Sequence, residues 1–321
     1  MLKTEVRALD NLEGFNQYKI LLWYRKDTTP KTMSTEDQVL TYFTVAIVTG
    51  AGTGIGLMQA QALAVNGTKV YIVSRTAEKL DKVAALYGKN IAGQLIPLTA
   101  DVTDKHSINN LVKEFSARED HLDILVNTAG IAGQSQSPNF RVPEELRRSL
   151  FESENSTFDD WDASYRTNVS SLYFMTTAFL PLLQKGTEQR YAWSSTVINT
   201  SSISGIVKVA QDHFSYNTSK AAASHLTKML SYEISKAGLK IRINQIAPGV
   251  FPSEMTSSNT DDKQKSHLHK AMMDGIVPAA RPGHDRDMAN AVIFVTTNQY
   301  LNGAVIVVDG GYMLATGAMY A

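Results

Sequence analysis

The sequence predicts an α/β fold, a doubly wound parallel sheet of about seven strands with helices on both faces. Two observations predict it. Short β-branched runs alternate with longer helical stretches from about Val45 onward, and a glycine-rich turn stands between the first run and the first helix. Such alternation is typical of βαβ units. A chain of 321 residues can bury about three quarters of its unfolded surface in one core. We therefore expect a single domain over residues 44–321, preceded by an N-terminal extension, residues 1–43, to which we assign no role.

The individual elements follow from hydrophobic periodicity. The predicted strands are Val45–Thr49, Lys69–Ser74, Gln94–Thr99, Ile124–Asn127, Val197–Ser201, Lys240–Ala247 and Ala304–Val308. Between them, apolar residues recur at three- and four-residue spacing, which indicates amphipathic helices. These helices begin near Gly54, Ala77, His106, Asp159, Tyr216 and Arg286.

Two segments interrupt the alternation, and we expect both to lie outside the sheet. Residues 132–158 are polar and then charged and amphipathic, and residues 249–284 carry three prolines and several methionines. Ligands of doubly wound sheets bind at the carboxyl ends of the strands, where both segments emerge. They are candidate substrate walls, and the alternative is that they are surface excursions. Apolar residues of the second segment could form a lid or simply cover the core: Phe251, Met255, Met272, Met273 and Ile276.

Composition excludes several functions. Lys plus Arg and Asp plus Glu number 31 each, so no excess positive charge favours nucleic acid or anionic lipid. The absence of cysteine excludes disulfides and thiol chemistry. No apolar run is long enough to span a bilayer and the first residues do not resemble a signal peptide, so we expect a cytoplasmic protein. The two histidines of His267-Leu268-His269 lack partners for a metal site, and no metal is expected.

The glycine-rich turn indicates a dinucleotide site. It follows the first predicted strand and opens the first helix, as Thr49, Gly50, Ala51, Gly52, Thr53, Gly54, Ile55 and Gly56. Glycines allow the backbone to approach a pyrophosphate, whose charge is met by amides at the helix N-terminus. The same glycines in isolation could be ordinary turn residues. Their place between strand and helix favours the dinucleotide.

The end of the second strand indicates which dinucleotide. A carboxylate there would bind the ribose 2′-hydroxyl of NAD, but this chain has Ser74 followed by Arg75. The Arg75 guanidinium offers a planar set of donors suited to phosphate. Such a contact contributes about 1.5–3 kcal/mol, enough to set a preference. We expect NADP(H), the alternative being that Arg75 is only a solvated loop residue.

Two Tyr-x3-Lys pairs occur, at Tyr216 with Lys220 and at Tyr232 with Lys236. On one helix the second pair lies about 24 Å further along and about 160° around the axis, so only one can face a cofactor. Tyr216 follows a strand that ends near Ser202, which would deliver a hydroxyl to the carboxyl edge of the sheet. We expect the first pair to be functional.

From about residue 44 to residue 315, these motifs together resemble the short-chain dehydrogenase/reductase family. The resemblance rests on the glycine turn, Asn127-Thr128-Ala129-Gly130, the helical Asn168, Ser202, and Tyr216 with Lys220. It also includes Asp101-Val102, Pro248-Gly249 and Asp309-Gly310-Gly311. Within the family the chain resembles microbial and fungal ketoreductases, including 3-oxoacyl and rhamnolipid-type reductases. The resemblance implies a Rossmann-type fold and cofactor contacts from Ser74, Arg75, Asp101, Val102, Asn127, Ala129, Gly130, Tyr216, Lys220, Pro248, Gly249, Ser253 and Thr256.

The chain departs from the family pattern at three places. Thr128 replaces a second asparagine, which should weaken a contact that stabilises the sheet. Ser253 stands where a threonine is usual, so either Ser253 or Thr256 would hold the nicotinamide carboxamide. The interval from Ser202 to Tyr216 is one residue longer than is common, which implies an extra loop residue near His213.

The resemblance implies proton donation from Tyr216 to the alkoxide that forms as a ketone is reduced. An ammonium about 5 Å away contributes about 3 kcal/mol at an effective dielectric of about 20, so we expect Lys220 to lower the pKa of Tyr216 by about two units. By the same resemblance Lys220 binds the nicotinamide ribose, Ser202 holds the substrate carbonyl and Asn168 ties Lys220 to a water chain. Asn168 could alternatively bond only its own backbone.

The sequence therefore predicts an NADP(H)-dependent carbonyl reductase or secondary-alcohol dehydrogenase with a small-molecule ketone or alcohol as its substrate. The alternatives are a catalytically inactive NADP-binding regulatory protein and an NAD-dependent secondary-alcohol dehydrogenase. A homodimer or homotetramer is expected because the helices at about Asp159–Leu183 and Tyr216–Lys236 carry apolar residues beyond one stripe. These are Leu172, Phe174, Met175, Phe179, Ala222, Leu226, Met229 and Leu230.

Overall fold

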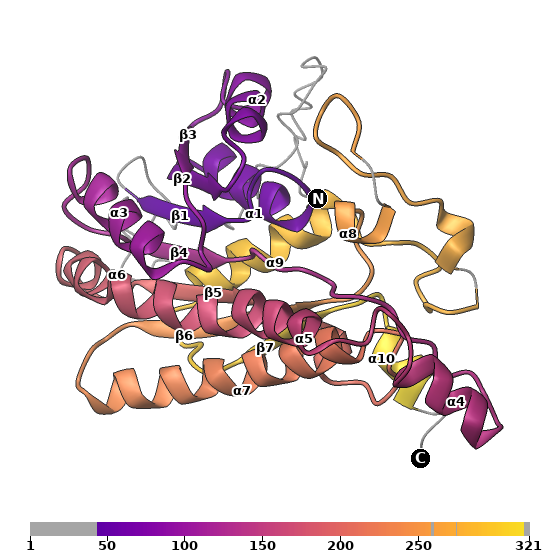
Figure 1. Ribbon diagram of the computed structural model, residues 1–321. Coiled ribbons are helices and arrows are strands. Elements are labelled where there is room, and N and C mark those ends of the chain that lie inside the picture. The colour runs from indigo at the N-terminus through magenta and orange to yellow at the C-terminus, as the bar shows by residue number, and fades with distance from the viewer. Residues whose placement is uncertain (1–43, 258–259, 274, 318–321) are drawn as a thin grey trace, which may run out of the picture.

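The computed structural model describes residues 44–257, 260–273 and 275–317, so the predicted extension 1–43 lies outside the described residues. Its centre is a seven-stranded sheet, and every strand pairs in parallel with its neighbours. The strands are β1 (Val45–Thr49), β2 (Lys69–Ser74), β3 (Gln94–Thr99), β4 (Ile124–Asn127), β5 (Thr196–Thr200), β6 (Arg242–Pro248) and β7 (Val305–Val308). Their spatial order is β3-β2-β1-β4-β5-β6-β7, which confirms the doubly wound Rossmann-type prediction (Figure 1).

Helices connect the strands and cover the sheet (Figure 1). They are α1 (Gly54–Val65), α2 (Ala77–Tyr87), α3 (Lys105–Ser116), α4 (Pro143–Leu150), α5 (Phe158–Tyr165), α6 (Ser171–Glu188), α7 (Phe214–Lys236), α8 (Glu254–Ser257), α9 (Asp285–Thr297) and α10 (Tyr312–Gly317). Short 3₁₀ turns lie at Ile203–Gly205 and Lys270–Met273.

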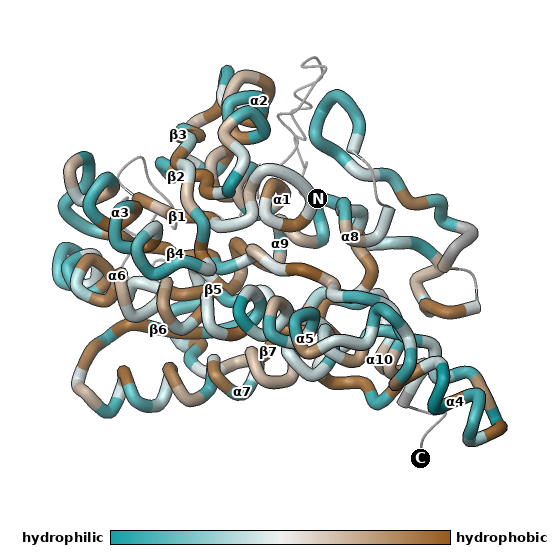
Figure 2. The backbone as a smooth tube through the Cα atoms, in the orientation of Figure 1, coloured by the Kyte–Doolittle hydropathy of each residue, from teal (hydrophilic) through white to brown (hydrophobic). Residues whose placement is uncertain are grey.

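The strands β1, β4, β5 and β6 bury both faces, because successive side chains point to opposite sides of a sheet. In β1, Ala46 and Val48 pack with α1, α2 and α9 on one face. Val45 and Ile47 pack with α3, α6 and α7 on the other face. Figure 2 shows hydrophobic residues along the strands in the middle of the molecule and mainly hydrophilic residues on α3 and α4. The runs of apolar residues therefore form two cores, one on each side of the sheet.

The prediction of one continuous helix from about Asp159 to Leu183 is wrong. The structure has α5, then a π turn at Arg166–Ser170, then α6. The bounds of β5, β6 and β7 also differ from the prediction by one or two residues, with β5 beginning at Thr196, β6 at Arg242 and β7 at Val305. A π turn places the hydrogen bonds one residue further along than an α-helix does, and hydrophobic spacing does not encode that change.

The eight apolar residues named for the helices α6 and α7 divide between the core and the surface, and half of them are buried. Leu172, Met175, Phe179 and Leu230 are at most 7% exposed and belong to the core. Other side chains of the same helices are exposed, namely Tyr173, Phe174, Met229 and Tyr232. An apolar outer face therefore exists on these helices, but only Phe174 and Met229 of the predicted set belong to it.

The two segments outside the sheet behave differently from each other. The first, residues 132–158, carries α4, which has no buried residue and stands away from the sheet (Figure 1). The second passes along the outside of α1 and α9, where Lys265 Nζ donates to Gln61 Oε1 and to Asp285 Oδ2, each at 2.7 Å. It then returns, and Met273 packs with Ile203 in a small apolar cluster.

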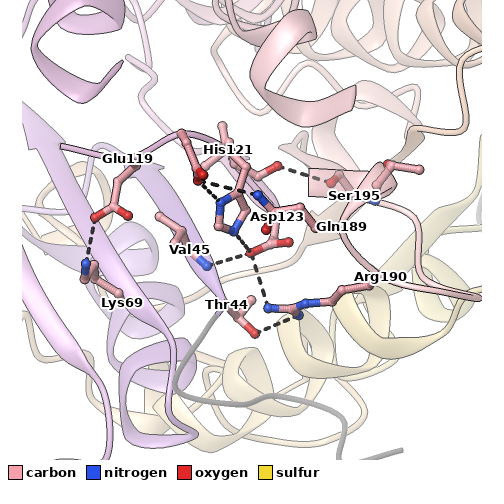
Figure 3. Close-up of polar contacts among 12 residues, drawn as sticks. Thr44, Val45, Lys69, Glu119, His121, Asp123, Gln189, Arg190 and Ser195 are labelled. Carbon is pink, nitrogen blue, oxygen red and sulfur yellow. Dashed lines mark hydrogen bonds and ion pairs between the residues drawn. The ribbon is translucent and has the colours of Figure 1, made fainter. Parts of the chain in front are cut away.

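A buried polar cluster lies at the amino ends of β1 and β4, as Figure 3 shows. Asp123 has no exposed surface. Its Oδ2 accepts the Val45 N–H at 2.8 Å and forms ion pairs with His121 Nε2 at 3.3 Å and Arg190 Nη2 at 3.8 Å. His121 Nδ1 also contacts Asp120 Oδ1 at 2.6 Å. This cluster joins the starts of two central strands at the edge opposite their carboxyl ends.

Candidate active site

A cavity of about 340 Å³ opens at the carboxyl ends of the strands, the edge at which ligands bind in such sheets. Its walls contain most of the residues predicted for the cofactor and for catalysis. These are Gly50, Gly52, Thr53, Gly54, Ile55, Gly56, Ser74, Arg75, Asp101, Val102, Ala129, Gly130, Ser202, Tyr216, Lys220, Pro248, Gly249, Ser253 and Thr256. Of the predicted set, only Thr49, Asn127 and Asn168 do not line it.

The two excursions contribute unequally to this cavity. No residue of 132–158 lines it, whereas Gly249, Phe251 and Ser253 to Thr256 of the second segment do. Met255 is exposed at the cavity, where a lid was expected, and Ile276 is half exposed, whereas Phe251 belongs to the core, as the alternative expected. The side chain of Met272 lies outside the described residues. The first segment is a surface excursion with respect to this cavity, and the start of the second is part of its wall.

The glycine-rich turn is tight enough to exclude side chains. A Cβ on Gly50 would lie 2.9 Å from the backbone of Ala129, and one on Gly56 would lie 2.3 Å from the Gly50 carbonyl oxygen. Gly54 has a φ of +55°, a conformation that glycine adopts without strain. No side chain caps the N-terminus of α1, so its first amides have no side-chain partner. Such amides suit a pyrophosphate.

The turn after β2 places cationic side chains at the cavity. Arg75 is exposed and lines the wall beside Ser74. Burial raises the pKa of Asp101, but hydrogen bonds from Thr103 and the charge of Arg75 outweigh this effect and hold that pKa below its usual value. Sequence reasoning missed Lys79, which lines the same wall. Its position in the first turn of α2, directly after the loop that carries Arg75, is the signal that could have found it.

Ser202, Tyr216 and Lys220 meet in the cavity wall. Ser202 follows β5, and its Oγ accepts the Ser204 N–H at 3.1 Å. Lys220 Nζ donates to the Thr200 carbonyl oxygen at 2.9 Å and lies over the Tyr216 ring, 5.6 Å from its centroid. A strand end and one turn of α7 thus bring a hydroxyl, a phenol and an ammonium together, as the sequence predicts.

The expected lowering of the Tyr216 pKa by Lys220 is wrong. Burial raises the pKa of Tyr216, and the hydrogen bond with Ser202 acts in the opposite direction. Burial also lowers the pKa of the Lys220 ammonium to about 8. Both effects have one cause, because a low-dielectric site disfavours the charged form of each group. The hydrogen bond from Ser202 is thus the contact that favours the tyrosinate.

Asn168 lies in the π turn and bonds a neighbouring loop, so the alternative of a bond only to its own backbone is excluded. Its side chain accepts the Ile131 N–H and donates to the Ile131 carbonyl, both at 2.9 Å. It also donates to Ser219 Oγ at 3.0 Å. A Cβ on Gly130 would lie 3.0 Å from Asn168 Oδ1 and 3.4 Å from Lys220 Nζ. Asn168 therefore holds the loop after β4 close to Lys220.

Thr49 and Asn127 are buried behind the cavity wall. Thr49 Oγ1 accepts the N–H groups of Thr128 and Ala129 at 2.9 and 3.2 Å. Asn127 Nδ2 donates to Asn199 Oδ1 at 3.0 Å. Neither residue lines the cavity, and both side chains join neighbouring strands, so their predicted role as cofactor contacts stays a prediction.

Thr128 also makes contacts that the departure from the family pattern did not suggest. Its hydroxyl bonds Gln59 Oε1 and lies 2.8 Å from Thr200 Oγ1. Gln59 is fully buried in α1, and its Nε2 donates to Thr200 Oγ1 at 3.3 Å. The three side chains close a triangle between β4, β5 and α1. The expected weakening is therefore offset by Gln59, a polar residue within an apolar helix that sequence reasoning missed.

The two hydroxyls proposed for the carboxamide differ in their surroundings. Thr256 Oγ1 donates to the Phe251 carbonyl oxygen at 2.8 Å and accepts the Ser253 N–H at 2.9 Å. Ser253 packs directly on the glycine turn, because a Cβ on Gly54 would lie 2.9 Å from Ser253 Cβ. Thr256 therefore stabilises the segment, while Ser253 faces the turn.

The second Tyr-x3-Lys pair lies elsewhere. Tyr232 is 63% exposed, Lys236 lies 5.8 Å from its ring centroid, and neither residue lines the cavity. The extra residue between Ser202 and Tyr216 is accommodated in a turn where Gln211 and Asp212 have φ values of +53° and +60°. The strand-to-helix geometry thus distinguishes two pairs of identical spacing.

Comparison with known proteins agrees with this geometry. The family described as short chain dehydrogenase matches residues 44–264. The chain belongs to the short-chain dehydrogenase/reductase family. It is therefore an oxidoreductase that acts on CH–OH groups.

Relatives and solved structures cover most of the chain. A short-chain dehydrogenase/reductase of Diaporthe leptostromiformis, PhomF′, is 38% identical over 86% of this chain and 93% of its own length. The rhamnolipids biosynthesis 3-oxoacyl-acyl-carrier-protein reductase of Pseudomonas aeruginosa is 32% identical over 84% and 96%. The structure described as Pseudomonas aeruginosa RhlG/NADP active-site complex superposes with a TM-score of 0.69 at 28% identity, over 86% of this chain and 98% of that one. Within the described residues, no helix is long and apolar enough to cross a membrane.

Proposed function

We propose that this protein is an NADP(H)-dependent carbonyl reductase, with Tyr216 as its general acid. The observation that carries the proposal is one cavity with Ser202, Tyr216 and Lys220 in its wall and Arg75 in the turn after β2. The glycine turn, the uncapped start of α1 and the Arg75 guanidinium fit a dinucleotide with a 2′-phosphate. When bound there, the nicotinamide would supply the hydride for reduction of a ketone.

Ser202 is polarised for donation. Its oxygen accepts the Ser204 N–H, so its own proton is available for the substrate carbonyl or for the Tyr216 oxygen. As the phenol gives its proton to the forming alkoxide, the Ser202 hydroxyl can turn its hydrogen bond to the phenolate. This contact lowers the pKa of Tyr216 and so favours the proton transfer.

Lys220 supplies charge beside the same phenol. With a pKa of about 8, the ammonium is mostly protonated at neutral pH, and it lies over the face of the Tyr216 ring. Its bond to Thr200 fixes its position at the end of β5. We assign Lys220 to binding the nicotinamide ribose. Asn168, which holds the loop after β4 beside it, is a positioning residue.

The test compares two matched variants. Tyr216→Phe should reduce kcat about 100- to 10,000-fold while NADPH binding is retained, as expected for loss of a general acid. Tyr232→Phe removes the phenol of the exposed second pair and should leave turnover nearly unchanged. Loss of activity in a folded Tyr232→Phe protein, or retained activity in Tyr216→Phe, would overturn the assignment.

The assay begins with an oxidation screen of NADPH and NADH. Because a relative is a 3-oxoacyl-acyl-carrier-protein reductase by its name, the ketones tested first are 3-oxoacyl thioesters, followed by polyketide-like ketones and small diketones. Turnover only with NADH supports an NAD-dependent alcohol dehydrogenase. NADPH binding without turnover of any substrate supports an inactive regulatory protein.

A further inference from the structure

An ion pair joins two residues of the cavity wall. Lys79 Nζ of α2 lies 2.6 Å from Glu254 Oε1 of α8. These two residues are 175 positions apart in the chain, and both line the cavity. Their side chains are 39% and 40% exposed. Neither residue belongs to a motif of the family pattern described above.

The stem of Lys79 runs beside the turn that follows β1. A Cβ on Gly52 would lie 3.4 Å from Lys79 Cβ, 3.8 Å from Lys79 Cδ and 3.6 Å from Ser74 Oγ. Lys79 and the end of β2 therefore border the same point of the cavity. Arg75, the residue proposed to bind the 2′-phosphate, directly follows Ser74 in the chain. The two cations thus belong to one corner of the site.

Glu254 approaches this corner from the opposite wall. It is the first residue of α8, and it follows Ser253, whose Cβ packs on Gly54 of the glycine turn. The ion pair therefore connects α2 with the segment after β6 that packs on the glycine turn. Asp101 adds a second carboxylate to the cavity wall.

We propose that Lys79 is a second specificity-determining cation, which the 2′-phosphate of NADP(H) takes over from Glu254. This proposal rests on the proposed NADP(H) preference. An ion pair this exposed stabilises the protein little, whereas a phosphate dianion forms stronger charge-assisted hydrogen bonds with an ammonium. Without Lys79, Arg75 alone would face a phosphate in a cavity that also holds Asp101 and Glu254. NAD(H) has no 2′-phosphate and leaves the pair in place.

The exchange has a consequence for Glu254. In the free protein the Glu254 carboxylate is paired with the Lys79 ammonium, which is the group that would bind the 2′-phosphate. Glu254 therefore competes with NADP(H) for Lys79. Removing its charge should tighten binding of 2′-phosphorylated ligands only. This effect requires Lys79. Simple repulsion between Glu254 and the phosphate would not require it, so the two explanations can be distinguished.

The experiment measures dissociation constants of NADP⁺, NAD⁺ and 2′,5′-ADP by titration calorimetry. The proteins are the wild type, Lys79→Met, Glu254→Gln and the double variant. Glu114→Gln is the matched control, since Glu114 forms a similarly exposed pair with Arg118 at 2.7 Å outside the cavity wall. The ligand 2′,5′-ADP has no nicotinamide, so it reports on the adenosine end alone.

Lys79→Met should weaken NADP⁺ and 2′,5′-ADP binding about tenfold or more, and Glu254→Gln should tighten it about two- to fivefold. Binding of NAD⁺ to these variants should change less than about twofold. The double variant should have the same affinities as Lys79→Met, and Glu114→Gln should have the same affinities as the wild type. Tightening by Glu254→Gln in the Lys79→Met background would overturn the exchange. So would variants whose NADP⁺ and NAD⁺ affinities change in parallel or not at all.

The wild-type affinities separate this proposal from the cofactor assignment. A wild type that binds NAD⁺ more tightly than NADP⁺ overturns both. A wild type that prefers NADP⁺, with variants that do not respond, overturns only the role of Lys79 and Glu254.

Discussion

Replacing His121 should change how the stability of the protein depends on pH. The ion pair with Asp123, which outweighs the effect of burial, and a smaller contribution from Asp120 raise the pKa of His121 to about 9. The imidazole is 12% exposed, so solvent screens the pair little. Because the folded chain binds this proton more tightly than the unfolded chain, the stabilisation is complete below about pH 6.5 and is lost as the pH rises through about 9.

The size of the effect follows from the two pKa values. Over the interval from about pH 6 to about pH 8, the folded chain keeps the proton while the unfolded chain loses it, which lowers the free energy of unfolding by about 2 kcal/mol. The interval ends at about pH 8 because the lowered pKa of Lys220 is about 8. Above that pH, deprotonation of Lys220 in the folded chain raises the free energy of unfolding and so opposes the effect of His121. His121→Gln removes the titrating group and with it this part of the pH dependence.

The assay is urea unfolding of the wild type and His121→Gln at about pH 6 and about pH 8. The difference between the two proteins should shrink by about 2 kcal/mol between these pH values. Asp120→Asn serves as the control, since it removes the exposed partner and leaves Asp123, the main cause of the shift. It should keep most of the wild-type pH dependence. Identical pH dependence in the wild type and His121→Gln would refute the reasoning.

Three further predictions concern the cofactor, the pH profile and the assembly. Arg75→Asp should change the ratio of kcat/KM for NADPH to that for NADH at least about tenfold, and a ratio within about threefold of the wild type would show that Arg75 is only solvated. Because the pKa of Lys220 is about 8, kcat/KM for ketone reduction should fall as the pH rises through that value. A kcat/KM that stays constant up to about pH 10 would contradict a role for the Lys220 ammonium. The exposed apolar residues of α6 and α7 should pair with a second copy of the chain, so sedimentation should show a dimer or tetramer. A single species near 35.3 kDa would exclude both assemblies.

The parts of the fold that the sequence predicted well are those encoded by local periodicity. The bounds of β1, β2, β3 and β4 agree with the predicted strands, because each is a short apolar run bounded by turn residues. The glycine turn and the order of Ser202, Tyr216 and Lys220 were also predictable, since fixed spacing on a strand end and one helix determines where the side chains emerge.

The parts that were not predictable depend on partners distant in sequence. Gln59 lies in an apolar helix, and only the packed structure shows that Thr128 and Thr200 satisfy it. The pKa of Tyr216 depends on burial, which spacing does not reveal. The pair of Lys79 and Glu254 joins segments from different βα units, and no local pattern relates them.

The π turn at Arg166–Ser170 also limits which insertions and deletions this chain can tolerate. A π turn amounts to one extra residue within an α-helix, so deleting one residue there would leave a regular helix with intact backbone hydrogen bonding. The deletion would shift residues of the turn by one position, about 100° around the helix. It would thereby withdraw the Asn168 carboxamide from both backbone groups of Ile131. This deletion would conserve helical content but would separate the loop after β4 from Asn168. The number of residues in this helix is therefore as important for the site as which residues they are.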